Sequence, residues 1–235
     1  MLLKTIQPSN HPTIQPSNHP TIQQPMAYKL KEMYYTLQGE GAHTGRPAVF
    51  CRFSGCNLWS GREEDRHKAI CQFCDTDFWG MDGENGGRYD AEGLVKQAAM
   101  LWGDTKKGKP YVVCTGGEPL LQLDEVLIEE FHRAGFEVGV ETNGTVEAPH
   151  GLDWTCVSPK AGTLLKITAG DELKLVYPQP GAMPPLYEHL EFEHFFIQPM
   201  DGPDVARNTR LAIDFCKENP QWRLSIQTHK LLNIP

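Results

Sequence analysis

Short apolar runs alternate with amphipathic segments along most of the chain. The apolar runs are rich in β-branched and aromatic residues, as strands are. The amphipathic segments repeat their apolar positions every three or four residues, as helices do. The predicted strands are 48–53, 111–114, 136–140, 154–157, 172–176, 195–197 and 224–227, and the predicted helices are 90–102, 124–134 and 204–218.

This order of elements predicts an α/β fold. Strands that alternate with helices favour a parallel sheet, and sites on such sheets follow the carboxyl ends of the strands. About six parallel strands are too few for a closed barrel of eight units, so we predict a partial, open β/α barrel. The segment 178–185 is rich in proline and does not have a helical pattern, so we expect loops to replace some crossover helices.

The first 25 residues have a different composition. The octapeptide TIQPSNHP occurs at 5–12 and again at 13–20, and 21–25 begins it a third time. Such a polar, proline-containing repeat cannot bury enough apolar area to offset its ordering entropy. We expect residues 1–25 to be a disordered extension, or upstream sequence translated from an early start codon. The catalytic domain is then predicted to begin at Met26 and to span 26–235.

Charge and composition narrow the function classes. The 235 residues carry a formal net charge of −8, which argues against nucleic acid or an anionic membrane as the main partner. Seven cysteines are an odd number without the spacing of a disulfide framework. No run approaches the length of a membrane span, and the N-terminus lacks the apolar region of a signal peptide. We therefore expect a reduced, cytoplasmic location.

Three cysteines are spaced as metal ligands. Cys71 and Cys74 form a Cys-x-x-Cys pair, and Cys56 stands just after the first predicted strand. Three thiolates hold three irons of a four-iron cluster and leave one iron open to a small molecule. A structural zinc site wants four protein ligands, for which His67 is a candidate. His67 lies in the charged run 62–68, which is typical of a solvated excursion, and the cysteines alone leave both metals open.

A glycine-rich segment follows the second predicted strand. Residues 115–119 read Thr-Gly-Gly-Glu-Pro. Two glycines remove side chains, so a ligand can approach the backbone closely. We expect Glu118 to sit at the rim as a carboxylate acceptor for an ammonium group; a tight turn with a surface glutamate is the alternative.

The cysteine loop and the Gly-Gly-Glu segment together resemble the radical S-adenosylmethionine superfamily. That superfamily has a Cys-x3-Cys-x2-Cys loop after its first strand, and its Gly-Gly-Glu binds the methionine amino group. Here the spacing between Cys56 and Cys71 is expanded. The inserted residues are mostly polar, and long surface insertions cost little closure entropy.

A narrower resemblance covers nearly all of residues 26–235. The motifs QGEG at 38–41, RFSGCNL at 52–58, CDT at 74–76, GGEP at 116–119, ETNG at 141–144, SPK at 158–160 and QPM at 198–200 occur in this order. Together they resemble the 7-carboxy-7-deazaguanine synthase family. The resemblance implies ring contraction of 6-carboxy-5,6,7,8-tetrahydropterin to 7-carboxy-7-deazaguanine with loss of ammonia, in queuosine and deazapurine biosynthesis. It also implies three cofactors: a 4Fe–4S cluster, S-adenosylmethionine and Mg²⁺.

The resemblance assigns site residues as follows. Substrate contacts are implied for Leu37, Gln38, Gly39, Glu40, Arg52, Thr115 and Glu141, and the C-terminal pattern adds His229 and Pro235. S-adenosylmethionine contacts are implied for Gly116, Gly117, Glu118, Ser158, Pro159, Lys160, Gln198, Pro199, Met200 and Asp201. The cluster falls to Cys56, Cys71 and Cys74, and Mg²⁺ to Thr76. No further side chain is assigned to catalysis.

Several of these residues have plain alternatives when read without the family. Gln38 suits the edge of a flat heterocycle, but it also suits an ordinary turn. Arg52 lies in an apolar strand, where a charge is costly unless paired, so we expect it to hold a carboxylate in the site. Glu141 could accept from guanidine-like N–H groups or begin a helix. Lys160 could be a solvated rim charge, and Thr76 a helix N-cap instead of a hard oxygen for magnesium.

The C-terminus is apolar and ends in proline. We expect residues 231–235 to pack across the mouth of the barrel and to bring the terminal carboxylate of Pro235 near the site. His229 would then end the last strand and face the substrate, although an isolated histidine there is often structural.

Two other functions fit the cysteines. One is a radical activating enzyme that acts on a protein partner, and the other is a non-enzymatic zinc-binding module. The family resemblance further implies a homodimer and a one-electron donor such as a flavodoxin or ferredoxin.

Overall fold

The computed structural model describes residues 27–104 and 107–235. The predicted N-terminal extension lies outside this part of the chain. The described strands are β1 (Tyr28–Leu37), β2 (Pro47–Phe53), β3 (Gly87–Tyr89), β4 (Tyr111–Gly116), β5 (Glu137–Thr142), β6 (Trp154–Val157), β7 (Ala169–Tyr177), β8 (Glu191–Pro199) and β9 (Trp222–Leu224). The α-helices are α1 (Ala91–Trp102), α2 (Glu125–Arg133), α3 (Val205–Glu218) and α4 (Thr228–Leu232).

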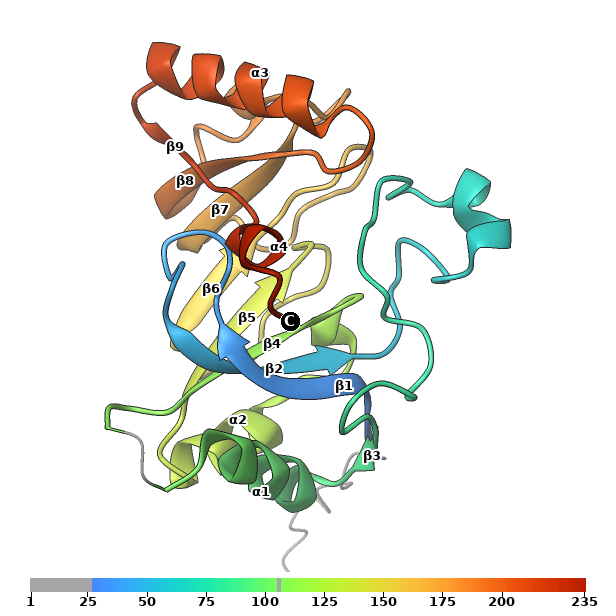
Figure 1. Cartoon of the computed structure of the whole chain (residues 1–235), viewed down its shortest axis with the longest axis vertical. Coiled ribbons are helices and arrows are strands. Elements are labelled where there is room, and N and C mark those ends of the chain that lie inside the picture. Colours follow the sequence, from blue (N-terminus) through green and yellow to red (C-terminus); the bar gives the residue numbers. More distant parts are fainter. Residues whose placement is uncertain (1–26, 105–106) are drawn as a thin grey trace, which may run out of the picture.

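All the described strands belong to one sheet in the order β3-β1-β2-β4-β5-β6-β7-β8-β9. The run from β2 through β4 to β9 is parallel, whereas β1 pairs antiparallel with β2 and with β3. The sheet does not close on itself, so the predicted open, partial barrel is confirmed (Figure 1).

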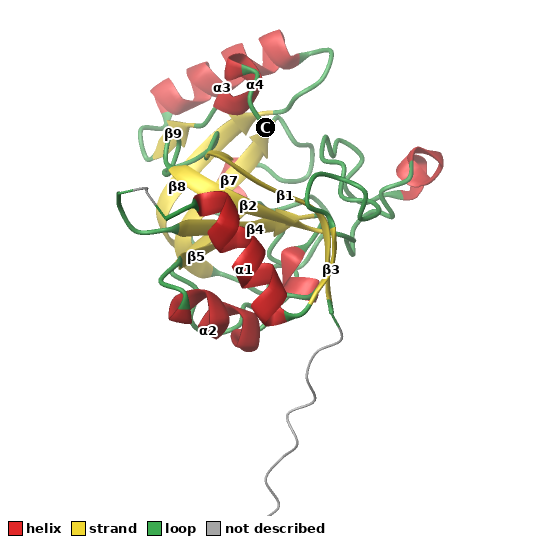
Figure 2. Cartoon of the chain, turned by 60° about the horizontal axis from the view of Figure 1, so that its bottom comes forward, coloured by secondary structure: helices red, strands yellow, loops and turns green. Residues whose placement is uncertain are grey.

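The helices cover the sheet unevenly, as predicted. α1 packs on β1 and on α2, and α2 packs on β5, at one end of the sheet (Figures 1 and 2). α3 packs on β8 and β9 at the other end. The connections from β5 to β8 contain only loops and the 3-10 turn η3 (Pro184–Leu186). Aspartates begin two helices where the sequence predicted: Asp90 accepts from Gly93 N, and Asp124 from Leu127 N.

Residues 54–86 leave the sheet between β2 and β3 as a long excursion (Figure 1). Its outermost part is the 3-10 helix η1 (Glu63–Lys68), which has no buried residue. A small apolar cluster of Trp59, Ala69 and Phe78 holds the base of the excursion, and Cys56 and Cys74 pack against it. The expanded cysteine spacing is therefore a polar surface insertion, as predicted.

The sequence prediction was wrong at both ends of the sheet. It missed β1, where a bulge between Leu30 and Glu32 breaks the two-residue alternation that marks a strand. It also placed the last strand at 224–227, whereas β9 spans Trp222–Leu224 and the chain then turns into α4. A tertiary contact explains why the strand ends early. Thr228 donates two hydrogen bonds to Gly39 O, one from its backbone N and one from Oγ1, each at 2.9 Å.

Within residues 27–104 and 107–235, every helix is too short or too polar to cross a bilayer.

Candidate active site

One cavity of about 370 Å³ gathers most of the residues that the sequence singled out. All the predicted substrate residues line it, as do all the predicted metal residues. The lining also includes seven of the predicted cofactor residues: Gly116, Gly117, Ser158, Lys160, Gln198, Pro199 and Asp201. Glu118, Pro159 and Met200 do not line it. The elements that contribute are mostly carboxyl ends of parallel strands, together with the excursion and the C-terminus.

The three cysteines stand on one wall of this cavity as free thiols. Cys56 accepts a hydrogen bond from Leu58 N at 3.4 Å, which fixes the turn after β2. His67 is exposed on η1 and does not line the cavity. Among the described residues, no three His, Cys, Asp or Glu side chains converge on one point as a single ion requires. A cluster spreads its ligands over separate irons, so the donor set fits a cluster better than one zinc.

The two glycines of the Gly-Gly-Glu segment make room for the cysteine loop. A Cβ on Gly117 would lie 2.2 Å from Gly55 O and 2.7 Å from Cys56 Cβ. Gly116 has φ +140°, and a Cβ there would lie 2.2 Å from Phe53 O. The expectation that the glycines serve ligand approach was therefore incomplete, because the backbone that approaches most closely belongs to the protein.

Glu118 is not at the rim, and that prediction was wrong. The residue is 0% exposed and its carboxylate is occupied by donors of the chain. Oε1 accepts from Thr142 Oγ1 at 2.7 Å and from Leu120 N at 3.0 Å, and Oε2 accepts from Asn143 N at 2.8 Å. Burial raises the pKa of the Glu118 carboxyl, against these hydrogen bonds, which favour its charged form. The carboxylate thus joins the loops after β4 and β5.

The structure does not support the alternative roles of Thr76 as a helix N-cap and of Lys160 as a solvated charge at the rim. Thr76 lies in an irregular stretch and no helix begins there, so it is not an N-cap. The Lys160 ammonium donates to Ser158 O at 2.6 Å and to Ser158 Oγ at 2.7 Å. Lys160 is half-buried, so it is not a fully solvated rim charge, and burial lowers its pKa. Lys160 and Thr76 face the same cavity as the cysteines.

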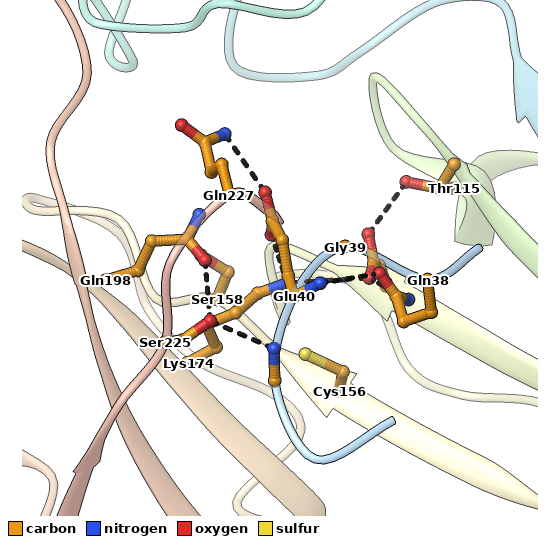
Figure 3. A network of polar contacts seen from close by, with 12 residues as sticks. Gln38, Gly39, Glu40, Thr115, Cys156, Ser158, Lys174, Gln198, Ser225 and Gln227 are labelled. Carbon is orange, nitrogen blue, oxygen red and sulfur yellow. Dashed lines mark hydrogen bonds and ion pairs between the residues drawn. The ribbon is translucent and has the colours of Figure 1, made fainter. Parts of the chain in front are cut away.

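A polar network forms the floor of the cavity (Figure 3). Gln38 Nε2 donates to Glu141 Oε1 at 3.0 Å, and Thr115 Oγ1 donates to Glu141 Oε2 at 3.3 Å. The Lys174 ammonium lies 3.5 Å from Glu141 Oε1 and 2.5 Å from Glu40 Oε2. Gln227 Nε2 donates to Glu40 Oε1 at 3.0 Å. No helix follows β5, so Glu141 does not begin one.

The charges of this network depend on one another. Burial opposes the charge of Lys174, but the carboxylates of Glu141 and Glu40 outweigh it and raise the pKa of Lys174 well above its usual value. Burial likewise opposes the charge of Glu40, but Lys174 overrides it and lowers the Glu40 pKa. Glu172, next to Lys174 on the same face of β7, has its pKa raised by burial.

Arg52 lines the cavity and is paired, as its place in an apolar strand required. Its Nε donates to Glu32 Oε1 at 2.7 Å, and one terminal nitrogen donates to Tyr34 Oη at 2.8 Å. The guanidinium has five N–H groups, so these two bonds leave donors for a ligand.

The C-terminus reaches the cavity, but not through its leucines. Leu231 and Leu232 are 74% and 61% exposed, so the expected apolar packing is wrong. Polar contacts hold the segment instead: Thr36 Oγ1 donates to Pro235 O at 3.0 Å, and Lys230 Nζ bridges Asp75 at 2.6 Å and Asp201 at 2.5 Å.

His229 lies in α4, and its ring packs against Gly39. A Cβ on Gly39 would lie 2.2 Å from His229 Nδ1, so only glycine fits there. His229 and Pro235 both line the cavity, which confirms their predicted position and leaves substrate contact as a prediction.

Sequence reasoning did not single out several polar residues in and behind the cavity, among them Glu172, Lys174, Ser225, Gln227 and Lys230. Ser225 Oγ accepts a hydrogen bond from Gly41 N at 2.9 Å and donates one to Gln198 Oε1 at 3.0 Å. A signal existed for Glu172 and Lys174, which are charged residues two apart in an apolar strand, the same pattern that marked Arg52. The other three follow the last strand, where no local pattern indicates their partners.

A partial parallel barrel with three free cysteines and a Gly-Gly-Glu loop around one cavity defines a radical S-adenosylmethionine enzyme. Over 89% of its length the chain is 60% identical to the whole 7-carboxy-7-deazaguanine synthase of Burkholderia multivorans, and 61% identical to that of Bradyrhizobium diazoefficiens. The chain therefore belongs to the 7-carboxy-7-deazaguanine synthase family. The crystal structure of QueE from Escherichia coli matches with a TM-score of 0.65 and 28% identity, over 86% of this chain and 94% of QueE. A scan against family models found no match.

Enzymes of this family are radical S-adenosylmethionine lyases that use a 4Fe–4S cluster and Mg²⁺. Membership of this family decides between the functions that the three cysteines alone left open. The zinc-binding module and the activating enzyme for a protein partner are both excluded, and the substrate is a small pterin.

Proposed function

We propose that the protein contracts the ring of 6-carboxy-5,6,7,8-tetrahydropterin to 7-carboxy-7-deazaguanine and releases ammonia, as a step of queuosine and deazapurine biosynthesis. The observation that carries the proposal is one cavity that is lined both by three free thiols and by the hydrogen-bonded pair Gln38 and Glu141. The identity to curated synthases over their whole length supports the same reaction.

We assign the cofactors to residues of this cavity. Cys56, Cys71 and Cys74 would hold the cluster, which together with S-adenosylmethionine would supply one-electron radical chemistry next to C6 of the substrate. The cavity residues of the segments 116–117, 158–160 and 198–201 would hold S-adenosylmethionine. Thr76 would offer a hard oxygen to Mg²⁺.

Substrate recognition is assigned to the floor and to Arg52. A carboxylate that is already fixed can accept from the N–H groups of the aminopyrimidinone edge, which suits Glu141 beside Gln38. The N–H groups of Arg52 that Glu32 and Tyr34 leave free can donate to the substrate carboxylate. Leu37, Gly39, Glu40, Thr115, His229 and Pro235 would complete the enclosure.

We also propose a domain boundary, an electron donor, a location and an oligomeric state. Residues 26–235 form the catalytic domain, and residues 1–25 are dispensable. The electron comes from a flavodoxin or ferredoxin, and the protein works in the cytoplasm. The chain acts as a homodimer.

The test is turnover by anaerobically reconstituted protein. We expect iron and sulfide near four each per chain, and formation of 7-carboxy-7-deazaguanine from the pterin with S-adenosylmethionine, Mg²⁺ and dithionite alone. Product detected by mass spectrometry without any added protein partner supports the assignment. Full cluster content without conversion of the pterin would refute it.

A further inference from the structure

Lys174 contacts both carboxylates of the cavity floor, Glu40 and Glu141, and it is deeply placed there. Its side chain is 6% exposed, and those of Glu40 and Glu141 are 15% and 24% exposed. A lysine is almost never buried unless it is paired. Here the strand dictates the position, because β7 alternates its faces and directs Glu172 and Lys174 to the same side.

Both oxygens of Glu141 are already held. Oε1 accepts a hydrogen bond from Gln38 Nε2 and lies near the Lys174 ammonium. Oε2 accepts a hydrogen bond from Thr115 Oγ1. A carboxylate has about four lone-pair positions, so these three contacts fix its plane and still leave room for a ligand N–H. Gln38 and Thr115 are neutral donors, whereas Lys174 is the positive charge that this oxygen pair faces.

The same ammonium also controls the neighbouring carboxylates. Glu40, Glu141 and Glu172 all approach one region of the floor, where like charges repel strongly because the dielectric is low. The 2.5 Å contact to Glu40 draws that carboxylate toward Lys174. Removing the ammonium would leave Glu40 and Glu141 free to move apart.

We propose that Lys174 is a positioning residue for recognition of the pterin ring: it holds Glu141 in the plane where that carboxylate accepts from the aminopyrimidinone edge. The inference rests on the proposed function and deepens it. Lys174 touches no reacting atom, and its effect reaches the ligand through Glu141.

Two stable ring analogues isolate this effect without turnover. In 6-carboxypterin the 2-position carries an amino group, which can donate to the Glu141 carboxylate. In 6-carboxylumazine the same position carries a carbonyl, so that two hydrogen-bond acceptors would oppose each other. Their dissociation constants are measured by anaerobic equilibrium dialysis against the reconstituted enzyme. We expect the native enzyme to prefer the pterin by about tenfold or more, as a lost hydrogen bond to a buried charge predicts.

Lys174→Met should reduce this preference to within about threefold, and Glu141→Gln should do the same. Lys31→Met is the matched control. Lys31 also lines the cavity and pairs with two carboxylates, Asp77 at 2.9 Å and Asp82 at 2.7 Å, and neither of these belongs to the floor network around Glu141. The control should keep the native preference, and Lys174→Arg should recover part of it because it keeps the charge.

Where Lys174→Met folds poorly, the double variant Glu40→Gln/Lys174→Met removes the unpaired carboxylate, and its preference should still be lost. A folded Lys174→Met protein with full iron content and undiminished preference for the pterin overturns the inference and leaves the proposed function intact. A native enzyme that binds both analogues equally overturns the recognition part of the proposed function as well.

Discussion

Glu118→Gln separates a structural carboxylate from one that binds a ligand. The substitution keeps the shape of the side chain and replaces one carboxylate oxygen by NH₂. In its better orientation the amide oxygen still accepts from Thr142 and Leu120, while the NH₂ group faces Asn143 N. A donor then opposes a donor at a site that is 0% exposed.

The magnitude follows from that single lost acceptor. A buried donor without a partner costs about 1–3 kcal/mol. The loss of a buried charge offsets part of this cost, because burial already raises the pKa of Glu118 and so penalises its ionised form. We expect a net destabilisation of about 1–2 kcal/mol, or a fall in Tm of roughly 2–8 °C for a domain of this size.

The assay is denaturant unfolding of the cluster-free protein, in which no cofactor contributes. Glu147→Gln is the control, because Glu147 is 83% exposed at its side chain and lies 3.9 Å from Lys166. If Glu118 served only as an acceptor for an ammonium group of a ligand, the cluster-free variant would match the native protein in stability. Equal unfolding midpoints for Glu118→Gln and Glu147→Gln would refute the structural role.

Four further predictions concern the ends of the chain and the metal ligands. Cys71→Ala should lower bound iron to background and abolish turnover while Cys216→Ala spares both; full iron in the first variant contradicts the assignment. Thr76→Ala should raise the Mg²⁺ concentration for half-maximal activity roughly tenfold and keep the cluster, and an unchanged Mg²⁺ response removes Thr76 from the metal site. A short peptide added after Pro235 should weaken substrate binding roughly tenfold but spare cluster assembly and uncoupled cofactor cleavage; unchanged affinity places the terminus outside the site. Truncation to Met26 should leave activity and Tm nearly unchanged, and a large loss of activity would make the extension part of the enzyme.

The sequence predicted most of the parallel sheet because its strands are short apolar runs with clear ends. It predicted α1 and α2 to within a residue or two at each end because each has an apolar face and an aspartate at its start. The order of the motifs also predicted that the three cysteines share one site, and all three line one cavity. These features are local, so a pattern in the chain suffices to find them.

Several of the errors involve partners that are distant in the sequence. Glu118 was expected at the rim, yet its acceptors are filled by residues 24 and 25 positions later, on the next strand and loop. Gln227 contacts Glu40 across 187 positions, and Lys230 contacts Asp75 across 155. No local period encodes such contacts, because they depend on how the sheet curves and brings its two ends together.

The ion pairs of Lys230 also explain why a peptide added after Pro235 can affect substrate binding without affecting cluster assembly. Lys230 Nζ joins α4 to Asp75, between Cys74 and Thr76, and to Asp201 after β8. Residues 231–235 follow it, and among the described residues the side chain of Thr36 donates to Pro235 O. Ion pairs that are more than a third exposed contribute little individually, but two carboxylates on one ammonium fix its position. We therefore expect an extension at Pro235 to displace the segment that borders the cavity, while Lys230 continues to hold the loop that contains Cys74.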